Sequence, residues 1–208
     1  MDTPTRADPP YVPLRHGRWP VHRTPRWLLL AGALVAAGAV LVGLAVHPSR
    51  SQRATDMNDF LAAMTGDIQS CAGGVRESLT VLRAIDSGAS HDQAIAVHIA
   101  SYGAKNCSPA NNSLLADLTQ YQVHESLARF HLNRAVEGLV TWAFPYAQRV
   151  QNDVADVLRA RGSAQAAARS KLQRDRRALD AQRARVTGTI MPAITATGAT
   201  ARLPSLPG

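Results

Sequence analysis

Cysteine, lysine and aromatic residues are all scarce in this chain of 208 residues. Cysteine occurs only at Cys71 and Cys107, which excludes a disulfide-dense fold and allows one bridge within the chain. Lysine occurs only at Lys105 and Lys171, and this strong arginine bias is typical of GC-rich genomes. Aromatic residues make up 5% and do not alternate with the basic ones, so no base-stacking platform is present. We therefore expect a helical core rich in Ala and Leu, and no nucleic-acid partner.

Catalytic and metal-binding motifs are also missing. The chain has no Gly-x-Ser-x-Gly nucleophile elbow, no Ser-x-x-Lys pair and no glycine-rich phosphate loop. The pairs His91/His98 and His124/His131 are each separated by two helical turns, about 10 Å, which is too far for neighbouring ligands of one ion. We therefore predict no enzyme activity, no metal and no cofactor, and interpret the histidines as surface or capping residues.

One long apolar run extends from Trp27 to Val46. It contains 20 residues without a charged or strongly polar side chain. As a helix rising about 1.5 Å per residue it would span about 30 Å, the thickness of a bilayer hydrocarbon core. This run therefore predicts a transmembrane helix over residues 27–46.

The orientation of this helix follows from its flanks. Four arginines precede the run closely and two follow it, so the positive-inside rule predicts that the N-terminus is cytoplasmic. Residues 1–26, which are basic and rich in proline, would be a disordered cytoplasmic tail, and residues 47–55 a linker to a domain outside the cytoplasm. A cleaved signal peptide, which would release a secreted basic helical protein, is the alternative, although the run is longer than the roughly 7–15 residues of such a signal.

Helical periodicity extends from residue 56 to residue 187. Apolar residues recur every three to four positions, and the predicted helices cover residues 56–86, 91–104, 113–120, 126–161 and 164–187. Ser90 to Gln93 has the form of a capping box for the second helix, whose inward residues would be Ile95, Ile99 and Tyr102. Pro145 is expected to kink the fourth helix.

Glycine and proline residues predict two further features, a close helix contact and a disordered C-terminal segment. The pair Gly73-Gly74 lies inside a helical pattern, where it would permit close helix packing. Residues 188–208 contain three prolines and are predicted to be disordered. The fold class is therefore all-α: a transmembrane helix followed by an antiparallel bundle of about four helices with one disulfide.

The cysteines fit the predicted hairpin of the first two helices. Cys71 lies about 22 Å before the end of the first helix at Asp86, and the second helix retraces about 20 Å from His91 to Ala104. Cys107 therefore returns to the level of Cys71. In an oxidising compartment we expect these residues to form a disulfide that contributes about 3–4 kcal/mol; the alternative is two free thiols.

The net charge of +8 is concentrated in two segments, residues 1–26 and residues 159–187. Residues 50–158 carry eight basic and eleven acidic groups, whereas residues 159–187 carry nine basic and two acidic ones. The segment 164–187 would attract anionic lipid headgroups, an anionic envelope polymer or an acidic protein, and a solvated helix face is the alternative. The residues proposed to bind such a surface are Arg169, Lys171, Arg174, Arg176, Arg177, Arg183 and Arg185.

Three strings resemble those of uncharacterised actinobacterial single-pass membrane proteins. They are Ser70-Cys-Ala-Gly-Gly-Val-Arg-Glu-Ser-Leu79, Asn106-Cys-Ser-Pro-Ala-Asn-Asn112 and Asp175-Arg-Arg-Ala-Leu-Asp-Ala-Gln-Arg183. The resemblance covers residues 27–187. It implies an architecture and a compartment, and no assigned activity comes with it.

Together these features predict a membrane-anchored, extracytoplasmic helical-bundle protein of the cell envelope with a non-enzymatic interaction or scaffold role. Its expected partners are the lipid bilayer, through residues 27–46, and an envelope protein, anionic polymer or headgroups, through residues 164–187. The alternative is a small-molecule sensory module in which Trp142 and Tyr146, beside the kink at Pro145, line a pocket.

Overall fold

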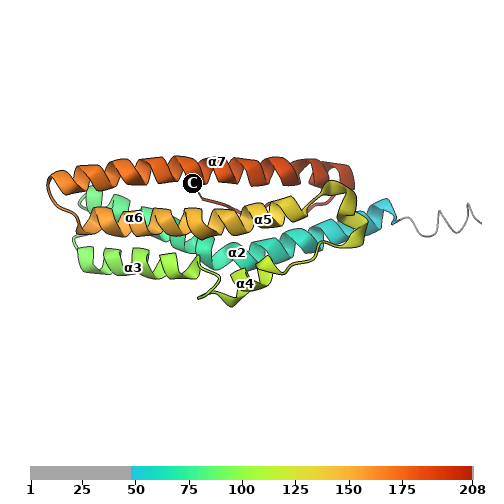
Figure 1. Cartoon of the computed structure of the whole chain (residues 1–208), viewed down its shortest axis with the longest axis horizontal. Coiled ribbons are helices and arrows are strands. Elements are labelled where there is room, and N and C mark those ends of the chain that lie inside the picture. Colours follow the sequence, from blue (N-terminus) through green and yellow to red (C-terminus); the bar gives the residue numbers. More distant parts are fainter. Residues whose placement is uncertain (1–47, 208) are drawn as a thin grey trace, which may run out of the picture. The chain divides into compact units, whose positions relative to one another are not determined.

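The computed structural model describes residues 48–207, and this part of the chain is all-α, as predicted. Two long helices, α2 (Arg50–Asp86) and α7 (Ser163–Thr197), run along the domain (Figure 1). The elements between them are α3 (Gln93–Asn106), α4 (Ser113–Thr119), the 3-10 segment η1 (Glu125–Phe130), α5 (Asn133–Thr141), the π-helical segment η2 (Trp142–Ala147) and α6 (Gln148–Arg159). The helices α2, α3, α5–α6 and α7 form the predicted bundle.

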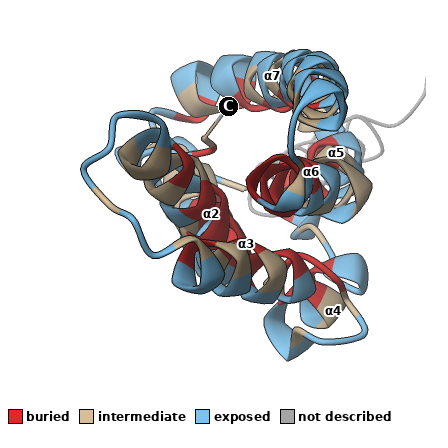
Figure 2. Cartoon of the chain, turned by 90° about the vertical axis from the view of Figure 1, so that its left-hand side faces the viewer, coloured by how far each residue is buried: buried red, intermediate tan, exposed pale blue. Residues whose placement is uncertain are grey.

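The core lies between the facing sides of these helices. Figure 2 shows the buried residues on the inner sides of α2, α6 and α7 and the exposed ones on their outer sides. Phe60 of α2 is buried and packs edge to face on Tyr121, with ring centroids 5.8 Å apart. Leu139 of α5 and Trp142 of η2 belong to the same core and are fully buried. Met57, Phe60, Met64 and Ile68 of α2 are buried at intervals of three to four residues, so the helical periodicity predicted over residues 56–86 is confirmed.

Two glycines allow α2, α3 and α6 to approach closely. A Cβ atom on Gly103 of α3 would lie 2.0 Å from Oε1 of Gln151, and one on Gly74 of α2 would lie 2.7 Å from the same atom. The end of the Gln151 side chain could move aside, but a Cβ on Gly74 would also lie 3.0 Å from the Cα of Gly103, so the close approach of the α2 and α3 backbones favours glycine here. A Cβ on Gly73 would meet open space. The predicted packing role of the glycine pair is therefore confirmed for Gly74 and not for Gly73.

The predicted inner face of α3 is wrong. Ile95 is 57% exposed and Tyr102 is 59% exposed, whereas Ile99 is half-buried. The buried residues are small: Ala96, Ala100, Gly103 and Ala104. Because α3 lies so close to α2 and α6, only small side chains fit between the helices, and the larger ones point outward. The helix is also capped by Asp92, whose side chain accepts from the backbone N–H of Ile95 at 2.9 Å, and not by the predicted Ser90.

The predicted continuous helix over residues 126–161 is divided. The kink at Pro145 is confirmed, because Phe144 before it has the extended angles φ −131° and ψ 116°. A proline ring disfavours the helical conformation of the preceding residue. A further break, which we did not predict, follows η1 at His131, which adopts a left-handed conformation with φ 51°.

The prediction of disorder over residues 188–208 is wrong within the described part. The last helix continues past residue 187 to Thr197 and ends at Gly198, whose φ of 74° suits glycine. The apolar stripe of this helix continues through Ile190 and Ala193, both buried. The free energy gained by burying them exceeds the free energy lost because Pro192 has no backbone N–H to donate. Residues 199–207 then pack against the bundle, where Leu206 is 9% exposed.

The first helix also begins earlier than predicted. The linker expected over residues 47–55 is helical from Arg50, because the side chain of Ser49 accepts from the backbone N–H of Gln52 at 3.0 Å and caps the helix. Within residues 48–207, no helix is both long enough and apolar enough to span a bilayer. The predicted span 27–46 and tail 1–26 lie outside the described residues.

Candidate functional site

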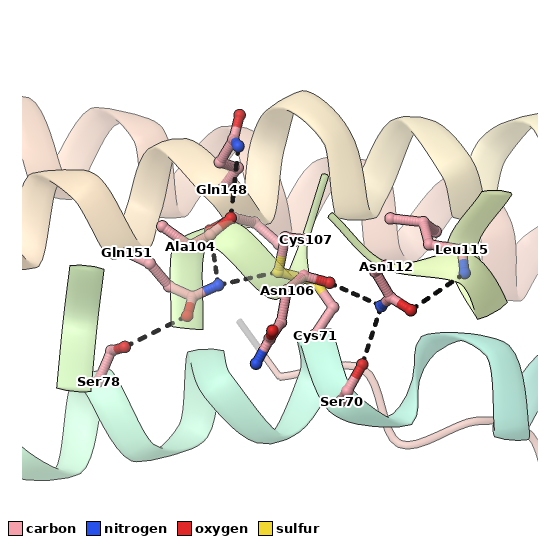
Figure 3. The surroundings of a disulfide bond; sticks show 11 residues. Ser70, Cys71, Ser78, Ala104, Asn106, Cys107, Asn112, Leu115, Gln148 and Gln151 are labelled. Carbon is pink, nitrogen blue, oxygen red and sulfur yellow. Dashed lines mark hydrogen bonds between the residues drawn. A yellow bond between two sulfur atoms is a disulfide. The ribbon is translucent and has the colours of Figure 1, made fainter. Parts of the chain in front are cut away.

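The predicted disulfide joins α2 to the end of α3. Cys71 and Cys107 form it, with Cα atoms 4.7 Å apart, and both are fully buried. Figure 3 shows Gln151 of α6 beside this bond. The side-chain amide of Gln151 donates to Sγ of Cys107 at 2.9 Å and accepts from the hydroxyl of Ser78 at 3.4 Å. The disulfide and this buried amide therefore tie the helical hairpin to α6.

A second polar contact holds the loop after the disulfide. The side-chain N–H₂ of Asn112 donates to the hydroxyl of Ser70 at 2.9 Å and to the carbonyl oxygen of Asn106 at 2.8 Å (Figure 3). Its side-chain oxygen accepts from the backbone N–H of Leu115 and caps α4. Asn112 thus fixes the loop against α2 at the end of the bridged hairpin.

The seven predicted basic residues lie on different sides of α7. Arg169, Arg176 and Arg183 follow one another at intervals of seven residues, so they lie on one side. Arg169 and Arg176 line a cavity shared with α2. Lys171 instead contacts Asp153 of α6. The structure therefore does not bring the seven residues together as one cluster.

Three of these cations are neutralised within the domain. Arg169 donates to both carboxylate oxygens of Asp86, at 2.9 and 2.5 Å, and this hydrogen bonding lowers the pKa of Asp86. Arg183 pairs with Asp180 at 2.8 Å, and Lys171 pairs with Asp153. The Arg169 and Arg183 pairs are substantially exposed and stabilise the fold by less than about 1 kcal/mol each.

Of the four other basic residues, Arg176 lines the cavity shared with α2, and Arg174, Arg177 and Arg185 lie on the outer side of α7. Arg174 and Arg177 are exposed and make no hydrogen bond or ion pair with another residue in the described part of the chain. Arg185 is also exposed and donates to the neutral side chain of Gln182 at 3.5 Å. Their spacing of three and eight residues places them on one side over about 17 Å. We name these three residues the outer arginine row.

A buried carboxylate supports the contact between α6 and α7. Asp153 is 1% exposed, and its Oδ1 accepts a hydrogen bond from Lys171. Its Oδ2 has no hydrogen-bond partner among residues 48–207. Burial raises the pKa of Asp153 to about 6; the Lys171 hydrogen bond opposes this rise, and the neighbouring Asp175 adds to it.

This raised pKa predicts a pH-dependent stability. The pKa of Asp153 is about 6 in the folded protein, against an ordinary value of 3.8, so between these values the folded state binds more protons than the unfolded state. The free energy of unfolding should then fall as pH rises from about 4 to about 6. Asp153→Asn removes this contribution. Urea unfolding across that range should therefore show a steeper loss of stability for the wild type than for the variant, and parallel pH profiles would contradict the assignment.

The residues suggested for a sensor pocket do not lie together at the surface. Trp142 is fully buried, and its Nε1 has no hydrogen-bond partner within residues 48–207. Tyr146 is half-buried, and the guanidinium group of Arg149 lies over its ring, 5.9 Å from the centroid. A ligand would reach the indole of Trp142 only by displacing core side chains.

Two of the described histidines, His98 and His124, make local side-chain contacts. His124 caps η1, since its Nδ1 accepts from the backbone N–H of Ser126 at 3.3 Å, and it also lies 3.2 Å from Asp56. His98 stacks on Tyr102 at the surface of α3. In the range 48–207, His, Cys, Asp and Glu form no group of three that could hold a metal ion.

No protein-family model, curated protein or solved structure matches this chain. The interpretation of α7 therefore depends on the geometry of its own side chains. Sequence reasoning found the basic residues of this helix, but it missed two arginines of α2: Arg83, which lines the cavity shared with α7, and Arg76, which lies beside the C-terminal segment at Ser205. Their spacing of seven residues, matching that of Arg169 and Arg176, was the available signal.

Proposed function

We propose that this protein is a membrane-anchored, extracytoplasmic helical bundle of the cell envelope that binds an anionic polymer or anionic headgroups through α7 and performs no catalysis. The apolar run 27–46 and its basic flank support the anchoring. The disulfide between Cys71 and Cys107 supports an oxidising compartment, because such bonds are rare in the cytosol.

The outer arginine row is the observation that carries the interaction. Its three guanidinium groups have no carboxylate partner within residues 48–207, so their charge is available to an external anion. Exposed Ala181 and Gly188 lie on the same side of α7 and leave room for an extended anionic surface to approach. Guanidinium groups bind phosphate in two-point geometry, so a phosphate-bearing surface suits them.

A charge-removal experiment tests this role. Full-length protein in phosphatidylcholine nanodiscs is titrated with long-chain polyphosphate in one arm and mixed with phosphatidylglycerol vesicles in a second. We expect the variant Arg174→Gln/Arg177→Gln/Arg185→Gln to lose about tenfold in affinity in at least one arm, since exposed ion pairs contribute up to about 1 kcal/mol each. Wild-type binding should weaken as salt is added.

The control removes the same charge from another surface. Arg129, Arg134 and Arg149 are exposed and lie outside α7. The variant Arg129→Gln/Arg134→Gln/Arg149→Gln should bind both probes as the wild type does. Equal affinity of the two triple variants would show that total charge, and not the outer arginine row, determines binding, and the proposal would fail.

A further inference from the structure

A cavity of about 330 Å³ lies between α2 and α3. It opens at the surface, since the exposed residues Glu77 and Tyr102 are part of its lining. Ser70 and Asn106 also line it, and they directly precede the two bridged cysteines in the sequence (Figure 3). The disulfide therefore holds the two walls of the cavity together. The volume lies at the lower end of the range of about 300–1,000 Å³ that is usual for small-molecule sites.

Three glycines line this cavity. Gly74 and Gly103 lie where the backbones of α2 and α3 approach closely, so packing explains both. Gly73 is different, because a Cβ atom there would meet no other atom within 4 Å. Glycine inside a helix is less favourable than alanine, so neither packing nor helix stability explains its presence at this position. The lack of a side chain at Gly73 instead keeps the cavity open.

Two aromatic rings of α3 also line the cavity. His98 and Tyr102 stack with their ring centroids 6.3 Å apart and their planes 17° from parallel. Both side chains are exposed, so neither ring is used to fill the core. The face of an aromatic ring carries partial negative charge and attracts cations. These rings therefore give the cavity a surface that suits a cation with an apolar outer shell.

The charge of the lining favours a cation as well. Glu77 is exposed, and its carboxylate has no hydrogen-bond or ion-pair partner within residues 48–207. Among the described residues that line the cavity there is no arginine or lysine. Half-buried Ile99 and the glycine backbone add apolar surface. An alkylated ammonium group combines a positive charge with apolar methyl groups, so it matches the carboxylate, the rings and the apolar surface together.

We propose that this cavity binds a small organic cation with an alkylated ammonium group. Its nitrogen lies between the carboxylate of Glu77 and the ring of Tyr102, and its methyl groups contact Gly73 and Ile99. The site is separate from the outer arginine row and takes a ligand of the opposite charge. The ammonium group belongs either to a lipid headgroup or to a soluble compound, and both share the chemistry that the cavity recognises.

Chemical-shift titration of the isotope-labelled full chain tests this site, in a polyoxyethylene detergent that carries neither charge nor sugar. The probes are choline, its uncharged carbon analogue 3,3-dimethylbutanol, and methyl glucoside, all at constant ionic strength. We expect choline to shift the amide signals of Gly73 and Gly103. It should bind at least about tenfold more tightly than 3,3-dimethylbutanol, because the alcohol lacks the charge that Glu77 and Tyr102 attract.

Filling the cavity gives the sharpest variant. Gly73→Leu should abolish the choline-induced shifts because the new side chain occupies the cavity. Its unfolding midpoint should not fall below that of the wild type, since its Cβ meets open space and leucine favours the helix. Gly66→Leu is the matched control. Gly66 lies seven residues earlier on the same side of α2, has no atom within 4 Å of its Cβ and lies outside the cavity, so this variant should bind choline as the wild type does.

Two further variants remove the groups that attract the cation. Glu77→Gln removes the carboxylate, and Tyr102→Leu removes the ring while keeping an apolar side chain. Each should weaken choline binding by up to about fivefold, because an exposed ion pair or cation–π contact contributes up to about that factor. Both residues are exposed, so these variants should fold as the wild type does.

Three results would overturn the proposal: equal binding of choline and 3,3-dimethylbutanol, wild-type choline binding by Gly73→Leu, or tighter binding of methyl glucoside than of choline. The last result would indicate a sugar site. Phosphatidylcholine nanodiscs distinguish the two sources of the cation. Loss of the choline-induced shifts there assigns the site to a lipid headgroup, and retained shifts assign it to a soluble cation.

The cavity and the outer arginine row fail independently. The variant Arg174→Gln/Arg177→Gln/Arg185→Gln should keep its affinity for choline, and Gly73→Leu should keep its affinity for polyphosphate. Loss of choline binding in the outer-row variant would contradict the assignment of this ligand to the cavity between α2 and α3.

Discussion

Replacing Cys71 and Cys107 together by alanine should lower the free energy of unfolding by about 4 kcal/mol. The two residues are 36 positions apart, and in the chain-entropy description a bridge over a loop of that length removes about this much free energy from the unfolded state. Loss of the hydrogen bond from Gln151 to Cys107 adds to the effect. Urea unfolding of the full chain in neutral detergent, followed by circular dichroism, measures the difference.

The reduced wild type is the natural control for this variant. Because both sulfur atoms are buried, reductant acts only after the domain opens, so the wild type should be unfolded and refolded in reductant before measurement. Its unfolding midpoint should then approach that of the double variant. A difference of less than about 1 kcal/mol between the oxidised wild type and the double variant would show that the bond does not stabilise this fold.

Trp142→Ala should have an effect of similar size, about 3–5 kcal/mol, because it leaves a large cavity in the core. The side chain is fully buried where α5 meets η2. Trp142→Phe should cost clearly less. Phenylalanine retains much of the apolar surface, and it removes an indole N–H that has no hydrogen-bond partner within residues 48–207. Unfolding midpoints of the two variants give the comparison.

Phe144 provides the neighbouring control. It is 43% exposed beside Pro145, so Phe144→Ala should cost less than about 1 kcal/mol, as surface substitutions usually do. If Phe144→Ala were as destabilising as Trp142→Ala, the assignment of inner and outer sides at the kink would be wrong.

The features that were predicted correctly from the sequence depend on local signals. The periodicity of α2 continues over many turns, so its buried face could be recognised without knowledge of its partners. The pairing of Cys71 with Cys107 followed from the rise of two helices joined by a short turn. The kink at Pro145 followed from the geometry of the proline ring alone.

The features that were missed depend on distant parts of the chain. For α3, the apolar stripe through Ile95 and Tyr102 looked like a core face, but the close approach of Gly74 and Gly103 selected the side with small residues. Residues 199–207 include Pro204 and Pro207 and form no helix, so their local sequence did not predict an ordered segment. They are ordered because α2 and α7, far apart in sequence, form a groove that binds them.

The sequence predicted which basic residues the candidate site contains, but not how these residues are arranged in space. Sequence counting identified the basic residues of α7, but it could not show that Lys171 is paired with Asp153 of α6 while Arg174 has no such partner within residues 48–207. Which charges are neutralised depends on the neighbouring helices. The same holds for Arg83, which lines a cavity with residues of α7 only because α2 lies beside that helix.

The thiol state of the protein in growing cells tests most directly whether the domain lies outside the cytoplasm. Cells are quenched in acid, and the denatured protein is labelled with maleimide before or after reduction and weighed by mass spectrometry. We predict that Cys71 and Cys107, joined in the structure, take up no maleimide before reduction and two equivalents after it. Labelling of both cysteines without reduction would contradict the placement in an oxidising compartment.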